Sequence, residues 1–154
     1  MSRYARADLA VYNSHGRLTA IVEIKSKVGT SRRWATLTRR NILAHGDIGG
    51  VEFFLLVTPD RLYLWKDAGM APNPVPPTYR ADTTTEFAPY FAGAGVRPDD
   101  ISGHAFELLV GAWLGDVMRS TRRARERTDT LRKLDESGLR IAVQDGRIEY
   151  EAVV

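Results

Sequence analysis

The chain contains no cysteine, and this absence limits the kinds of site that it can hold. Disulfide bonds and thiolate metal centres are excluded, and the composition fits a reducing compartment. The three histidines, His15, His45 and His104, do not have the spacing of a zinc site. The sequence also has no phosphate-cradling glycine motif and no serine, histidine and aspartate arrangement of a hydrolase. Carboxylates and cationic side chains are the remaining candidates for chemistry.

Long apolar runs are also missing. The longest fall far short of a membrane span, and no cationic and apolar signal region stands at the start. We therefore expect a cytoplasmic protein without a membrane partner. With 154 residues, of which 44% are hydrophobic and 27% charged, the composition is that of one globular domain, residues 1–154, able to bury a core.

Two apolar runs near the start, residues 7–12 and 18–25, are joined by a polar turn that contains Gly16. This pattern predicts a β-hairpin. The register depends on the length of the turn. We take His15 and Gly16 as a two-residue loop, whereas a three-residue loop would shift the register by one and reverse the faces.

With the two-residue loop, Asp8 lies directly opposite Glu23, about 5 Å away between Cβ atoms. Lys25 shares their face, because side chains two residues apart on a strand point the same way. Opposed carboxylates repel each other and need a compensating cation. That cation is either Lys25 or a divalent metal, and hard oxygen ligands favour Mg²⁺. An ordinary solvated ion pair is the alternative.

The combination of Asp8 with Glu23-Ile24-Lys25, a predicted helix over 31–44 and a buried strand over 51–57 resembles the PD-(D/E)XK nuclease superfamily. The resemblance covers residues 1–66. It implies a restriction-endonuclease-like α/β fold, with a mixed central sheet flanked by helices.

The resemblance also implies roles for these residues. Asp8 and Glu23 would bind Mg²⁺, with Mn²⁺ as a possible substitute, and the backbone carbonyl of Ile24 could add a ligand. Lys25 would orient or deprotonate the attacking water and stabilise charge that develops on phosphate. The metal would act as a Lewis acid and lower the pKa of its water.

The sequence departs from the family in two places. Ala7 stands where a proline often precedes the aspartate, and only seven residues precede Asp8. Family members usually have a helix, often with a further acidic residue, and a strand before this position. Either the core is abbreviated, or a C-terminal element or a partner chain fills the gap.

The net charge of +3 is small, but the cations are clustered between residues 25 and 40 and between 119 and 133. Such groups bind nucleic-acid phosphates in a salt-dependent way. For the second cluster, a solvated helical face is an equal alternative. The predicted nucleic-acid-binding residues are Lys27, Arg32, Arg33, Arg39, Arg40, Arg122, Arg123 and Arg125.

Residues 67–101 form a connector rich in proline and glycine, in which residues 83–91 form a short helical or irregular segment. We interpret it as a surface spacer rather than a binding lid. Residues 102–154 are expected to form a long helix, continuing through the arginine-rich run to 134, and then a hairpin around Asp145-Gly146.

The apolar stripe of residues 102–118 has helical spacing. It predicts a helix that packs on the sheet, in the place of the missing N-terminal helix, or that forms a homodimer surface. If it packs on the sheet, Glu107 can replace the acidic residue of the family's first helix.

These observations lead to three functional hypotheses. The first is a metal-dependent deoxyribonuclease, an endonuclease or a nuclease subunit, with Asp8, Glu23 and Lys25 as catalytic residues and DNA as a more fitting partner than RNA. The second is a catalytically inactive nuclease-like fold that binds DNA or assembles with proteins. The third is a scaffold whose interface surrounds Trp113.

Overall fold

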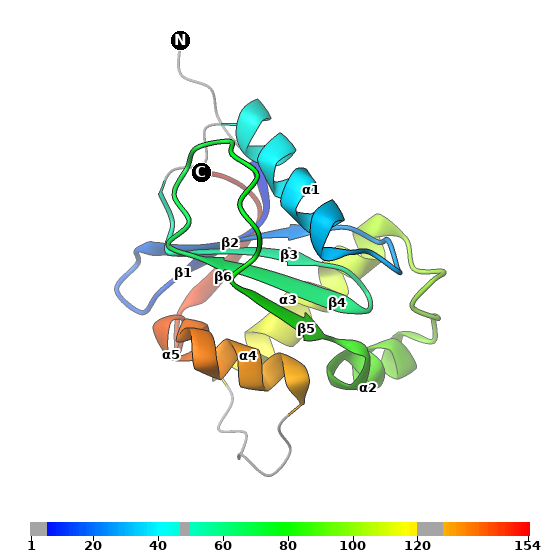
Figure 1. Cartoon of the computed structure of the whole chain (residues 1–154). Coiled ribbons are helices and arrows are strands. Elements are labelled where there is room, and N and C mark those ends of the chain that lie inside the picture. Colours follow the sequence, from blue (N-terminus) through cyan, green and yellow to red (C-terminus); the bar gives the residue numbers. More distant parts are fainter. Residues whose placement is uncertain (1–5, 47–49, 120–127) are drawn as a thin grey trace.

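The computed structural model describes residues 6–46, 50–119 and 128–154, and Figure 1 shows their arrangement. A six-stranded mixed sheet in the order β5-β4-β3-β2-β1-β6 forms the centre. Only the pair β2 and β3 is parallel among these strands. The strands are β1 Arg6–Tyr12, β2 Leu18–Ile24, β3 Phe53–Val57, β4 Arg61–Lys66, β5 Tyr79–Asp82 and β6 Arg147–Val153. The predicted α/β class with a mixed sheet flanked by helices is confirmed.

Helix α1 (Arg32–His45) connects the two parallel strands and covers one face of the sheet. Ser31 caps its N-terminus, because its side chain accepts a hydrogen bond from the backbone N–H of Trp34. The apolar residues under α1 include Ile21, Phe54 and Trp65. Parallel strands require such a crossover, so the predicted strand, helix and strand unit follows directly from the chain's hydrophobic pattern.

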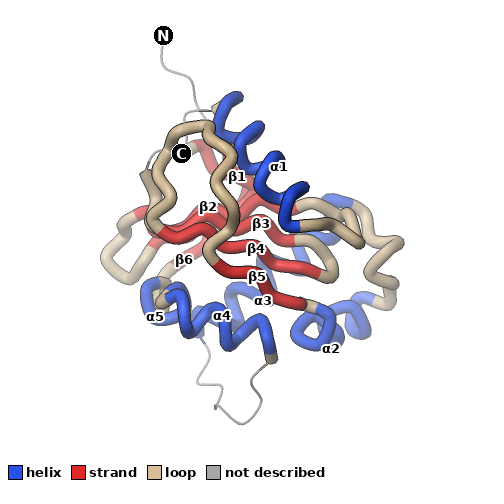
Figure 2. The backbone as a smooth tube through the Cα atoms, in the orientation of Figure 1, coloured by secondary structure: helices blue, strands red, loops and turns tan. Residues whose placement is uncertain are grey.

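Helices α2 (Thr84–Ala94), α3 (Gly103–Arg119), α4 (Asp129–Ser137) and α5 (Leu139–Ala142) lie on the opposite side of the sheet from α1 (Figure 2). The apolar stripe of α3 packs inside the larger core, and the side chain of Trp113 is completely buried. The expected packing of this helix on the sheet is therefore confirmed. The stripe is covered within one chain, so it does not provide the predicted dimer or scaffold interface.

The predicted continuous helix from 102 to 134 is wrong. Helix α3 ends at Arg119, and α4 begins after Thr128, whose extended backbone and side-chain hydrogen bond to the Leu131 N–H form a separate N-cap. Buried Glu86 on α2 holds the two helices together. Its carboxylate accepts hydrogen bonds from Trp113 Nε1 at 2.8 Å and Thr128 Oγ1 at 3.0 Å.

The predicted C-terminal hairpin is also wrong. Leu139–Ala142 is the short helix α5, because Gly138 in the left-handed conformation ends α4 and allows a tight turn into it. Only the second half of the expected hairpin is a strand, β6. The connector is likewise more ordered than a simple spacer, since residues 67–101 contain β5 and α2.

Strand β6 pairs antiparallel with β1 along nearly its whole length. It lies beside the strand that carries Asp8. The first and last strands, β1 and β6, therefore lie side by side at this side of the sheet.

Gly146 tests the placement of β6. A Cβ atom there would lie 1.9 Å from the backbone oxygen of Tyr12, whereas a Cβ at Gly93 in α2 would meet nothing within 4 Å. We expect Gly146→Ala to lower the free energy of unfolding by about 1–3 kcal/mol. We expect Gly93→Ala to raise it by up to about 1 kcal/mol, because alanine favours helix. Chemical denaturation of both variants measures this, and equal stabilities would contradict the close approach.

Candidate functional site

The hairpin that brings Asp8 to Glu23 has a different turn from the predicted one. Residues 13–17 separate the paired residues Tyr12 and Leu18, and Asn13 closes the turn by accepting the N–H groups of His15 and Arg17. This longer turn shifts the register by one. A bulge in β2 at Thr19 then shifts it back, so that Val11 pairs with Ala20 and Leu9 with Val22. Continued by one residue, this register places Asp8 opposite Glu23, as predicted.

The regular pairing of β1 with β2 stops at Leu9, one residue short of Asp8. There the Asp8 carboxylate accepts the Ile24 backbone N–H at 2.8 Å. On the other side of β1 the regular pairs are Ala7 with Ala152 and Leu9 with Tyr150, which places Glu151 across from Asp8. Glu151 has a φ of 46°, in the strained left-handed region. The Asp8 position is thus a local irregularity, of the kind found near functional sites.

Glu23 is buried, with 7% of its surface exposed, although the sheet around it is apolar. Its pKa is raised from 4.5 to about 9, chiefly by burial and also by the charge of Asp8 and a hydrogen bond to the Asp8 side chain. The charge of Lys25 opposes this shift, and Glu107 adds to it. At neutral pH the protein without a metal therefore holds a proton between the two carboxyl groups.

Glu107 on α3 belongs to the same electrostatic cluster. Burial raises its pKa, as do the charges of Asp8 and Glu151, while His104 lowers it. The speculative placement of Glu107 near the carboxylate pair is thus consistent with the fold. Sequence reasoning missed Glu151, since only the unexpected pairing of β6 with β1 brings it here, and it missed the proximity of His104 to Glu107 on the same helix.

Lys25 follows the end of β2 and is exposed, and its backbone N–H donates to the Val57 carbonyl oxygen at 3.0 Å. This bond extends the parallel pairing past Ile24 and fixes the start of the loop. Lys25 stands two residues after Glu23, and the charge of its side chain favours the ionised form of the Glu23 carboxyl group. Glu23, Ile24 and Lys25 are therefore held at the C-terminal end of β2, beside Asp8.

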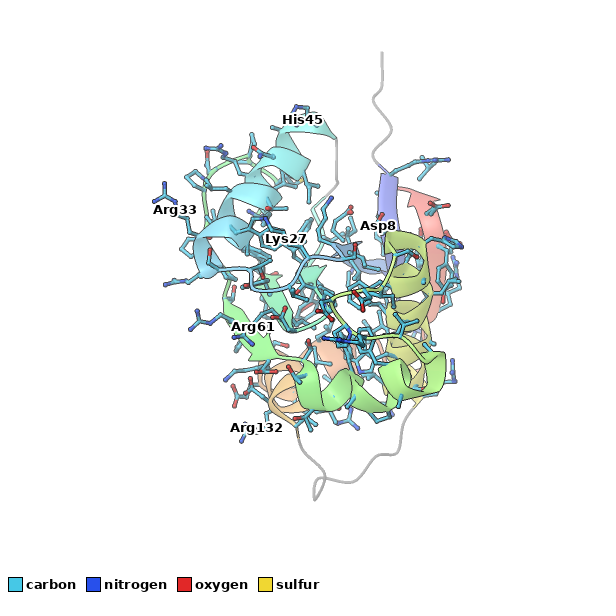
Figure 3. The ribbon with its side chains drawn as sticks, turned by 90° about the vertical axis from the view of Figure 1, so that its right-hand side faces the viewer. Asp8, Lys27, Arg33, His45, Arg61 and Arg132 are labelled. Atoms are coloured by element: carbon cyan, nitrogen blue, oxygen red, sulfur yellow. The ribbon has the colours of Figure 1, made fainter. Side chains whose placement is uncertain are left out.

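The predicted nucleic-acid-binding residues have different surroundings. Lys27 lies over the Trp34 ring at 5.7 Å, and Arg32 and Arg33 are exposed in the first turn of α1. Arg40 is half-buried. Figure 3 shows Asp8, Lys27 and Arg33 along the side of the molecule where β2 ends, with Arg33 pointing outward. Arg122, Arg123 and Arg125 lie outside the described residues.

The expectation for Arg39 is wrong. Only 2% of its surface is exposed, and its guanidinium packs against the Phe54 and Trp65 rings at 5.6 and 5.5 Å. One nitrogen donates to the Gly69 carbonyl oxygen, and burial lowers its pKa. The aliphatic stem and the flat guanidinium of Arg39 pack in the apolar layer between α1 and the sheet. Arg39 therefore supports the core and cannot reach a phosphate.

Within residues 6–46, 50–119 and 128–154, no group of three or more histidine, aspartate or glutamate side chains is arranged to hold a metal ion. The same part of the chain has no helix with the length and hydropathy for crossing a membrane. No family model, curated protein or solved structure matches this chain.

The raised pKa of Glu23 makes the stability of the fold depend on pH. The unfolded chain loses this proton near pH 4.5 and the folded chain near pH 9, so stability falls as the pH rises between these values. In Glu23→Gln the amide donates to Asp8 as the protonated acid does, without titrating. In the absence of metal at pH 8, we expect the free energy of unfolding of this variant to exceed that of wild type by about 1–3 kcal/mol.

Urea denaturation at pH 5 and pH 8 in EDTA measures this difference. Glu52→Gln is the matched control, because Glu52 is exposed and remote from the carboxylate pair. Its stability should follow that of wild type at both pH values. A Glu23→Gln variant that is less stable than wild type at pH 8 would contradict the shared proton.

Proposed function

We propose that this chain hydrolyses phosphodiester bonds of nucleic acid with the help of Mg²⁺, with DNA as the substrate to test first. The carboxyl pair of Asp8 and Glu23 carries the proposal. Two acids that share a proton in a buried place, with a lysine beside them, are costly for the fold. Such strongly shifted groups are concentrated at functional sites, where a cation or substrate relieves their repulsion.

The donor chemistry of the site fits a hard divalent cation. Carboxylate and carbonyl oxygens are the ligands that Mg²⁺ prefers, and Mg²⁺ is commonly held by only one or two carboxylates together with water and phosphate. Asp8, Glu23 and the Ile24 carbonyl would hold it, and Glu107 is a further acid in the same cluster. When bound, the metal supplies Lewis acidity and lowers the pKa of a coordinated water.

The residues of the chain have separable roles in this proposal. Glu23 gives up its proton when the cation binds, and the Ile24 N–H keeps the Asp8 carboxylate in place through its 2.8 Å hydrogen bond. Lys25 orients the attacking water and stabilises negative charge that develops on the phosphate. Its exposed side chain at the end of β2 leaves it accessible to a substrate.

The topology supports the resemblance to the PD-(D/E)XK superfamily. Strands β1 and β2, helix α1 and strand β3 follow one another as the family's aspartate strand, Glu-x-Lys strand, helix and next strand do. Strand β6 beside β1 and helix α3 with Glu107 are the elements that would take the part of the family's first strand and its acidic first helix. We propose that the same kind of core is built here with its first elements supplied from the C-terminal half.

Cleavage assays test the proposal. With purified protein, Mg²⁺ or Mn²⁺, and a panel of single-stranded, duplex and forked DNA, we expect wild type to cleave at least one substrate. Glu23→Gln and Asp8→Asn should each lower kcat/KM by about 100-fold or more, because each removes a metal ligand. Glu52→Gln should cleave as wild type does, and unchanged cleavage by Glu23→Gln would contradict the proposal.

One observation favours a second candidate, a nuclease-like fold that binds nucleic acid without cutting it. The described residues contain no cluster of three potential ligands arranged for a metal. This candidate predicts salt-sensitive binding of DNA that persists in EDTA and in Glu23→Gln, with no cleavage of any member of the panel.

A further inference from the structure

A polar pocket of about 400 Å³ opens beyond β4 and β5 on the side of the sheet that α1 covers. It lies between the N-terminus of α1 and the outer strands, away from the carboxylate pair. Three arginines from three different elements meet in it, together with two hydroxyl groups and two acids. Its principal lining residues are Thr30, Arg32, Arg61, Tyr63, Arg80 and Asp82.

The register explains why these side chains converge. Tyr63 on β4 pairs with Arg80 on β5, and Arg61 pairs with Asp82 two residues away, so all four lie on one face. Tyr63 belongs to the apolar cluster beneath α1, which identifies that face. Its hydroxyl lies 2.9 Å from Thr30 Oγ1, and this contact joins the pocket to the loop before α1.

The two acids in the pocket already have other partners. Asp82 accepts Arg61 Nη1 at 3.1 Å and the Thr84 N–H at 2.8 Å, and these bonds lower its pKa. Asp129 accepts the Asp82 N–H and lies within ion-pair distance of Arg132 and Lys133. Both carboxylates are therefore already paired with cations, Asp82 with Arg61 in the pocket and Asp129 with Arg132 and Lys133 on its own helix.

Arg32 and Arg80 are the two arginines of the pocket whose guanidinium groups have no partner among the described residues. In the part of the chain that the structure describes, neither side chain makes a hydrogen bond or an ion pair, and both are exposed. The first turn of α1 also has no acidic residue to offset its positive end. Two free guanidinium groups beside two hydroxyls suit a phosphate. Each guanidinium group can donate two parallel hydrogen bonds to two phosphate oxygens.

The pocket lies at the same end of the sheet as the carboxylate pair. Glu23 stands near the end of β2 and Arg61 at the start of β4, and the Gly29 N–H of the intervening loop donates to Asp60 in the β3–β4 turn. Figure 3 shows Asp8, Lys27 and Arg61 following one another across this side. Strand β5 is three positions from β2, which corresponds to about 14 Å, or about four nucleotides of B-form rise.

We propose that this pocket binds a second phosphate of the nucleic-acid strand that the carboxylate pair cleaves, and so sets the distance between an anchored phosphate and the cut. The inference rests on the proposed function, since it takes nucleic acid as the ligand. Arg32 and Arg80 hold the phosphate, while Arg61 and Tyr63 keep the wall in shape. The phosphate is either a terminal monophosphate or an internal phosphodiester, which share this chemistry.

Fluorescence anisotropy in EDTA tests the pocket without any cleavage. The probe is a single-stranded DNA 12-mer, labelled at its 3′ end and carrying either a 5′-phosphate or a 5′-hydroxyl. Proteins to compare are wild type, the double variant Arg32→Ala/Arg80→Ala, and the control Arg17→Ala/Arg147→Ala. The control removes the same charge at the opposite, hairpin-turn end of the sheet, where both arginines are exposed.

We expect the pocket variant to bind about tenfold more weakly and its log–log salt slope to fall by about 0.7 for each arginine removed, since each contact releases counterions. The control should bind as wild type does. A loss seen with both probes identifies an internal phosphodiester, and a loss confined to the 5′-phosphorylated probe identifies a terminal one.

Equal affinity and slope in the pocket variant and the control would overturn the pocket assignment, as would a failure of wild type to bind either probe. The binding readout is independent of catalysis. A protein that binds through Arg32 and Arg80 but never cleaves would refute the nuclease and leave the phosphate pocket standing. Matching circular dichroism melting curves establish that the variants are folded.

Discussion

The hydrogen bond from the Ile24 amide to the Asp8 carboxylate is the contact on which the site depends. It replaces a regular strand pairing at the point where β1 leaves β2, and it holds one carboxylate beside another that is buried. The fold tolerates this unfavourable pair because the rest of the sheet is fixed by a continuous apolar core on both faces. A destabilising pair of acids within an otherwise well-packed sheet is the kind of local irregularity that is expected at functional sites.

Strands from the N-terminal and C-terminal parts of the chain, β1 and β6, both contribute to the surroundings of the carboxylate pair. Strand β6 covers the far side of β1, and its strained Glu151 stands across from Asp8. Helix α3 brings Glu107 into the same cluster of charges. In a protein whose net charge is +3, acids are concentrated here while free cations line the loop after β2 and the pocket at β4 and β5. This separation of charge suits a metal ion at one position and a phosphate backbone along the rest.

Local patterns were enough to predict β1, β2, α1 and β3, because each has a clear apolar run or stripe bounded by polar turns. The opposition of Asp8 and Glu23 was predicted from a turn that is too short, and the Thr19 bulge compensates for that error. Asp-Gly suggested a hairpin, but the pairing of β6 with distant β1 depends on tertiary packing. The burial of Arg39 and the separate cap at Thr128 likewise depend on neighbours that are remote in sequence.

A carbon-detected NMR titration of the glutamate side-chain carboxyl groups, without Mg²⁺ and at several Mg²⁺ concentrations, in wild type and in Asp8→Asn, tests the cation site most directly. We expect the pKa of Glu23 to be about 9 without metal and to fall towards neutral pH or below as Mg²⁺ is added, because metal and proton compete for one site. In Asp8→Asn the pKa without metal should be lower than in wild type, and Mg²⁺ should change it much less. A Glu23 that titrates near 4.5 in metal-free wild type, or one that is unaffected by Mg²⁺, would contradict the claim that these two carboxyl groups form a cation site.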